Sequence, residues 1–206
     1  NNEKRELLGS RQISFIERSV ECSDAWNLYA QQVLLGSLKL PFIPDETIDR
    51  LPSFQQYLKL VIREDLPFNF DAWDGYPAER KRLLKAVGSK SQKNIFVAGD
   101  THNCWVSNIK DEESFRGVEL GTPSVTSPGA SENFAGLIPA TDLEKAVVNK
   151  NKNLKWTNLS NRGYLTINFN PGFADAEFKG VNNIASKDYS SMILKKFKIL
   201  PGKEII

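Results

Sequence analysis

The feature that most constrains the fold is a short apolar run, residues 94–98, which ends abruptly at Gly99 and Asp100. Its length suits a strand buried on both faces better than a helix. A helical pattern over residues 78–87 precedes it, with Pro77 suited to the first turn. An earlier apolar run, residues 26–35, predicts a second buried strand. The order strand, helix, strand predicts an α/β layered fold.

The second half of the chain is expected to be richer in strands than the first. Four prolines interrupt residues 37–70, so no long element is expected there. Alternating apolar and polar residues in the last third predict a hairpin of half-exposed strands. The remaining expected elements are helices over residues 10–23, 54–63 and 141–150, a strand-like segment over 118–123, a strand pair over 162–169 and 174–181, and a last strand over 195–200.

Composition excludes several classes of function. The 206 residues are enough for one domain with a sizeable core. Lys and Arg number 27 against 25 Asp and Glu, so charge gives no case for nucleic acid or an anionic membrane surface. No apolar run approaches the roughly 18 to 20 residues that cross a bilayer. The first residues lack the apolar stretch of a signal peptide.

Cysteine and histidine content restricts any metal site. Cys22 and Cys104 are too few for a zinc site built from four thiolates, and the sequence does not say whether they pair. His102 is the only histidine. A metal site formed wholly by this chain would therefore need carboxylate, carbonyl or amide ligands.

Asp100 and His102 follow the apolar run directly. In an extended segment, residues two apart point to the same side, and ligands of α/β proteins bind beyond the carboxyl ends of strands. Both side chains are competent ligands for zinc, iron or manganese. The alternative is an ordinary turn in which Asp100 bonds to the local backbone, and spacing alone favours that turn. A nucleophilic pair of Cys104 with His102 is disfavoured, because the two side chains lie out of reach of each other in a turn.

Two further polar segments are ambiguous by themselves. Asp71 and Asp74 lie between aromatic residues and could bind a metal or orient its ligands. The alternative is a helix-capping turn, which is the commoner role of such acids. Residues 124–129 hold three hydroxyl groups that could bind an anion, but they lack the glycines and lysine of a phosphate-binding loop and also fit a plain loop.

Taken together, the motifs indicate one protein family more specifically than any single motif does. They occur in the order of a known family: Leu-Leu-Gly at residues 7–9 with Gln-Gln-Val at 31–33, Asp-Ala-Trp-Asp-Gly-Tyr-Pro-Ala-Glu-Arg at 71–80, Gly-Asp-Thr-His-Asn at 99–103, Ser-Val-Thr-Ser-Pro-Gly at 124–129, and Arg-Gly-Tyr at 162–164. The chain resembles the PhoD-like alkaline phosphatases, within the calcineurin-like metallophosphoesterase superfamily. The family's usual Trp-Leu is Phe15-Ile16 here.

The resemblance implies a two-sheet sandwich flanked by helices (α/β/β/α) that hydrolyses phosphomonoesters or phosphodiesters with a metal-bound hydroxide. It implies that Asp100 and His102 are metal ligands, with His102 in a catalytic role. Asp71, Asp74 and Asn103 would lie beside the metals or the substrate. The implied metals are iron and calcium, with zinc or manganese as further options. The implied location is periplasmic or secreted.

The resemblance also implies that part of the site is missing. The superfamily's early ligand motifs precede the Leu7-Leu8-Gly9 passage, and this chain opens almost at that passage. We therefore expect residues 1–206 to be the C-terminal portion of one catalytic domain, completed by an N-terminal half of the same protein or by a companion chain. Alone, it is expected to expose apolar sheet edges and to self-associate. The alternative is a non-catalytic structural or binding module that keeps the fold without a complete metal site.

Overall fold

A computed structural model describes residues 4–21, 25–88, 92–134 and 136–206. The apolar run forms β2 (Asn94–Ala98), which lies between β1 (Asn27–Ala30) and β4 (Ser114–Gly121) and runs parallel to both. The antiparallel β3 (Cys104–Asp111) and then β5 (Leu154–Asn158) complete a five-stranded sheet in the order β1-β2-β4-β3-β5. The carboxyl ends of β1, β2 and β4 consequently lie at one end of this sheet.

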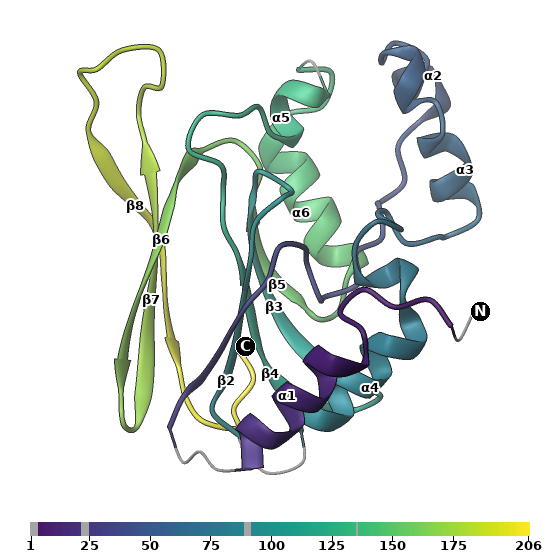
Figure 1. The fold of residues 1–206 in the computed structure, drawn as a ribbon. Helices are drawn as coiled ribbons and strands as arrows, with labels where there is room; N and C mark the ends of the chain where they lie inside the picture. The colour runs from purple at the N-terminus through teal and green to yellow at the C-terminus, as the bar shows by residue number, and fades with distance from the viewer. Residues whose placement is uncertain (1–3, 22–24, 89–91, 135) are drawn as a thin grey trace.

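A second, three-stranded sheet covers one face of the first (Figure 1). It is an antiparallel meander of β6 (Arg162–Asn170), β7 (Phe173–Val181) and β8 (Ser191–Ile199). Alternation along β7 buries Ala176 and Phe178 against residues such as Ile95 of the larger sheet. The two sheets therefore share one apolar core, because each strand presents every second side chain to it.

Helices cover the opposite face of the larger sheet (Figure 1). Phe96 and Ile109 pack against the helical layer there, and Ala98 and Trp105 belong to a neighbouring cluster that includes residues of the last helix. The outer face of the three-stranded sheet bears no helix in the ranges that the structure describes. The helical elements are α1 (Ser10–Glu21), α2 (Asp45–Ile48), η1 (Ser53–Gln55), α3 (Leu58–Arg63), η2 (Trp73–Gly75), α4 (Pro77–Val87), α5 (Ala130–Asn133) and α6 (Ala140–Lys150).

The predicted α/β class, with two sheets and a strand-rich second half, is confirmed. The predicted strand over residues 26–35 is wrong beyond Ala30. From there the chain leaves the sheet, and the backbone N–H groups of Leu35 and Gly36 donate to the buried Glu119 carboxylate. The strand over residues 104–111 was not predicted. The helix expected to end at residue 23 is described only to Glu21, and Cys22 lies outside the described residues.

A buried carboxylate joins the N-terminal passage to α4. Glu79 is 0% exposed and accepts hydrogen bonds from the backbone N–H of Leu7, of Leu8 (3.1 Å) and of Gly9 (2.8 Å). Gly9 has a φ of 78°, a left-handed conformation that glycine adopts without steric cost. The contact connects two motifs that are about 70 residues apart in the sequence. The two motifs therefore pack against each other in the folded chain.

No helix within the described ranges is long and apolar enough to cross a membrane.

Cys104 is a free, fully buried thiol. Its burial raises the thiol pKa to about 12, so it is not a ready nucleophile.

Candidate metal centre

The loop Gly99–Asn103 connects the end of β2 to the start of β3. Asp100 and His102 both have positive φ values, 65° and 61°, and the N–H of Thr101 donates to the Gly99 carbonyl over 2.8 Å. This is a tight turn centred on Asp100, in a conformation that non-glycine residues rarely adopt. Of the two alternatives, the chain therefore has the turn and not the extended segment, because it must reverse sharply to enter β3. Such local strain is typical of functional sites.

His102 is oriented by a backbone carbonyl. Its Nδ1 lies 2.8 Å from the Pro128 carbonyl oxygen, which can only accept a hydrogen bond. In the neutral imidazole, Nδ1 therefore carries the proton and the lone pair is on Nε2. Metal-bound histidines commonly donate their second ring N–H to a carbonyl in this way. The residue thus has the tautomer that a metal ligand needs.

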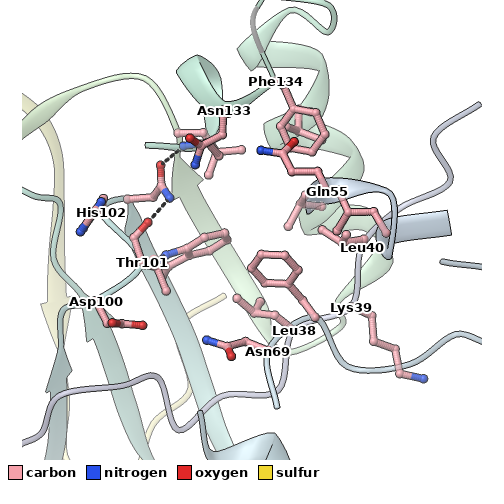
Figure 2. Close-up of a pocket in the computed structure, with 18 of the residues that line it drawn as sticks. Leu38, Lys39, Leu40, Gln55, Asn69, Asp100, Thr101, His102, Asn133 and Phe134 are labelled. Carbon is pink, nitrogen blue, oxygen red and sulfur yellow. Dashed lines mark hydrogen bonds between the residues drawn. The ribbon is translucent and has the colours of Figure 1, made fainter. Parts of the chain in front are cut away.

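Asn103 holds the loop in place. Its side chain is almost fully buried, donates to the Thr101 carbonyl and accepts from the Ala130 N–H over 3.0 Å (Figure 2). The indole N–H of Trp105 donates to the Thr101 hydroxyl over 2.6 Å. The Asn103 amide therefore links the loop to the segment after Gly129, which favours a positioning role beside the centre.

The hydroxyl-rich segment 124–129 contains Pro128, whose carbonyl orients His102. The Ser124 hydroxyl donates to the Ser127 carbonyl over 2.6 Å, which fixes the turn before Pro128. The Glu132 carboxylate then accepts from the Gly129 N–H over 3.1 Å and forms an ion pair with the buried Arg162. These contacts hold the carbonyl that orients His102, so the segment acts through its backbone.

Asp71 and Asp74 do not line the cavity that contains Asp100 and His102. Asp71 is exposed, and its N–H donates to the Asn69 side chain over 2.9 Å in a local turn. Asp74 accepts from the Leu38 N–H at 3.4 Å. Burial raises the pKa of Asp74, against hydrogen bonds from Ser37 and Leu38 that lower it. Asp74 therefore holds the backbone of the segment that precedes the cavity wall.

Sequence reasoning missed Glu119, which performs a similar task. It is buried in β4 and accepts from the Leu35 N–H at 2.5 Å and the Gly36 N–H at 2.9 Å. Arg80 donates to the Leu35 carbonyl over 2.8 Å and so holds the same turn. Burial raises the pKa of Glu119 to about 7, although both N–H donors and the Arg80 charge oppose the shift. In the sequence, the only sign that Glu119 has a structural role is that a charged residue interrupts an apolar strand.

The free energy of unfolding is expected to depend on Glu119 ionisation. A folded-state pKa near 7 exceeds the ordinary value of 4.5, so the folded chain retains a proton that the unfolded chain has lost. The stabilisation is complete below about pH 4.5 and is lost as the pH rises through 7, amounting to about 3 kcal/mol. Urea unfolding between pH 4.5 and 8 should show this loss in the wild type, and Glu119→Gln should lack it. Parallel pH profiles for the two proteins would contradict the assignment.

Asp100 and His102 border a cavity of about 380 Å³. Figure 2 shows their loop on one side, with Leu40 and Gln55 on the other. Its walls are mainly apolar and include Leu38, Leu40, Leu58, Phe68, Trp105, Phe134, Leu143, Val147 and Leu159. The turn and the cavity together place a carboxylate, an imidazole and an apolar chamber side by side.

Asp100 and His102 fit part of a metal site. They supply a carboxylate and a correctly polarised imidazole, both suitable for iron, and the carboxylate also suits calcium. In the described ranges, no group of three or more His, Cys, Asp or Glu side chains converges to hold a metal ion. A centre held only by histidine, cysteine and carboxylate ligands would therefore need more of them than the two at this corner.

Comparison with known proteins shows the family to which the chain belongs. A family model described as PhoD-like phosphatase matches residues 1–178. The chain belongs to the PhoD-like phosphatase family. Over 185 residues it is 28% identical to alkaline phosphatase D of Bacillus subtilis (strain 168), covering 86% of this chain and 27% of that protein.

A solved structure of PhoD superposes with a TM-score of 0.70 at 21% identity, over 98% of this chain and 35% of the PhoD chain. This likeness supports the fold over nearly the whole chain. The PhoD-like resemblance of the motifs is thereby confirmed. The chain spans about a quarter of the curated relative's length and about a third of the solved PhoD chain.

Proposed function

We propose that this chain forms the C-terminal part of a metal-dependent phosphoester hydrolase of the PhoD type. The observation that carries the proposal is the hydrogen bond from His102 Nδ1 to the Pro128 carbonyl, within a strained turn that also holds Asp100. This bond leaves Nε2 available as a ligand, and the strain is best explained by a functional demand on the two side chains.

Asp100 and His102 are proposed as two of the metal ligands. A metal bound there would supply a hydroxide nucleophile at neutral pH and neutralise charge on the phosphoryl oxygens. Pro128 holds the imidazole of His102 in one tautomer and one orientation. Asn103 keeps the loop from opening, since it ties Thr101 to Ala130. The substrate is a phosphomonoester or phosphodiester.

The remaining ligands are proposed to come from an N-terminal half of the same protein or from a companion chain. Two findings support this: the chain matches only 27% of the curated relative, and the described residues bring no third acidic, histidine or cysteine ligand to the corner. Iron and calcium are the proposed metals, with zinc or manganese as alternatives, and the proposed location is periplasmic or secreted. These last two proposals rest on family resemblance.

The competing proposal is a non-catalytic module that keeps the fold without a complete metal site. The observation that favours it is that no third acidic, histidine or cysteine side chain of the described residues joins Asp100 and His102. Both proposals accept the described fold, and they differ in whether metal and turnover accompany it.

Metal removal separates the two. The full-length protein that contains this chain should hydrolyse a chromogenic aryl phosphate, and chelation should lower the rate at least about a hundredfold because the nucleophile is lost. Adding back iron and calcium should restore the rate, and elemental analysis should find the metals bound stoichiometrically. Circular dichroism before and after chelation controls for unfolding. A metal-free protein without turnover would support the non-catalytic module and overturn the proposed hydrolase.

A further inference from the structure

The cavity beside Asp100 and His102 has chemistry that phosphoester hydrolysis itself does not require. Phe68, Trp105 and Phe134 contribute aromatic surface, and Leu143 and Leu159 contribute aliphatic surface. At about 380 Å³ it lies at the lower end of the range typical of small-molecule sites. A phosphate group alone would gain nothing from these walls, so they are suited to the organic part of a substrate.

Gln55 is a polar residue on the cavity wall opposite Asp100 and His102. Its side chain lines the cavity, it is only 9% exposed, and it points inward (Figure 2). None of the described residues makes a hydrogen bond to this amide. The amide nitrogen and oxygen are not fully enclosed, so a molecule in the cavity can reach them. A bound molecule that both accepts and donates a hydrogen bond would satisfy it.

The wall that carries Gln55 is held firmly to the rest of the molecule. Asn151, at the end of α6, accepts from the Lys39 N–H and donates to the Lys39 carbonyl, each over 2.8 Å. The Asp65 carboxylate pairs with both Lys39 and Lys150. The segment between β1 and α4 is thus tied to α6 across one end of the cavity. The ammonium group of Lys39 is also already paired, so the apolar chamber favours a neutral group.

We propose that this cavity binds a planar aromatic ring with a hydrogen-bonding edge, of the nucleobase kind, as the organic group of the phosphoester substrate. The ring would pack on Phe134 and Trp105, and its polar edge would meet the Gln55 amide. Aromatic side chains stack on bases of any sequence, and a buried amide selects a ring with matching donors and acceptors. The substrate role rests on the proposed hydrolase function, whereas binding of the ring does not.

Ring binding can be measured without turnover. Adenosine, which has no phosphate, should bind the full-length protein in calorimetric titration and quench tryptophan fluorescence through Trp105, whereas ribose should do neither. Gln55→Leu should weaken adenosine binding by about tenfold, since a buried hydrogen bond is lost. Toluene binding should be unchanged, because toluene has no hydrogen-bonding group and uses only the apolar walls. Gln12→Leu, which replaces an exposed glutamine of α1, is the matched control.

Turnover gives the second measurement. The ratio of kcat/KM for a nucleoside 5′-phosphate to that for glycerol 2-phosphate should fall by about tenfold in Gln55→Leu, with glycerol 2-phosphate hydrolysed as before. If Gln55→Leu does not fold, Gln55→Met, which is unbranched and of similar length, replaces it. Adenosine binding without any phosphatase activity would refute the hydrolase and support the ring site. Phosphatase activity with no adenosine binding, or with equal binding by wild type and both Gln55 variants, would overturn the ring site alone.

Discussion

Replacing either Asp100 or His102 by alanine is expected to lower kcat/KM of the full-length protein toward an aryl phosphate by about a thousandfold or more. Substitution of residues that only orient metal ligands typically costs about 10 to 100-fold, so loss of a ligand itself should cost more. Thermal unfolding should change little, because Asp100 is exposed and His102 is only partly buried. Both variants should also bind less metal, measured by elemental analysis on the same preparations.

An exposed acid elsewhere provides the control. Asp188→Ala, in the loop before β8, should keep wild-type activity and metal content. If Asp100→Ala and His102→Ala both retain activity within about tenfold of the wild type, the corner does not hold the catalytic metal and the proposed function fails.

Glu79→Ala is expected to lower the free energy of unfolding by about 3 kcal/mol or more. The substitution strands the backbone N–H groups of Leu7, Leu8 and Gly9 beside a cavity, and each unpaired donor costs about 1 to 3 kcal/mol when it remains buried. Solvation of the freed passage offsets part of this cost. Urea unfolding at pH 7 measures the change.

Glu79→Gln should lie between alanine and the wild type, because one amide oxygen can still accept while the amide NH₂ faces backbone donors. Glu113→Ala, at an exposed glutamate in the β3–β4 turn, should change the free energy of unfolding by less than about 0.5 kcal/mol. An effect of Glu79→Ala as small as that control would show that the N-terminal passage does not depend on this carboxylate.

Local patterns predicted the elements whose own residues carry a clear helix or strand signal. Residues 94–98 and 162–181 carry clear strand signals, and Pro77 begins α4 as expected. The strand at 104–111 lacked such a signal, because buried polar residues interrupt its apolar pattern. Asn108 is one of these, and its amide is satisfied by the backbone of Ile205 near the end of the chain. No local pattern contains a partner that is 97 residues away.

The residues of the site also divide into those with a local sequence signal and those whose role depends on distant contacts. The motif around Asp100 and His102 was visible in the sequence and its spacing alone favoured a turn, but the sequence did not show that both residues adopt a left-handed backbone. Gln55 carried no signal, because its meaning depends on the cavity formed when residues 38–69 meet α6. Glu119 resembled an ordinary strand residue until the Leu35–Gly36 turn closed over it. Tertiary contacts decide each of these roles.

The link between Lys39 and Asn151 has an evolutionary consequence. The turn at residues 99–103 and the wall that carries Gln55 belong to separate segments, which meet across one cavity. Mutations in residues 38–69 can thus change the shape of the cavity while the Gly99–Asn103 loop keeps its geometry. If the proposed functions hold, descendants of such a chain can acquire new preferences for organic groups one substitution at a time, with the proposed hydrolytic chemistry inherited unchanged.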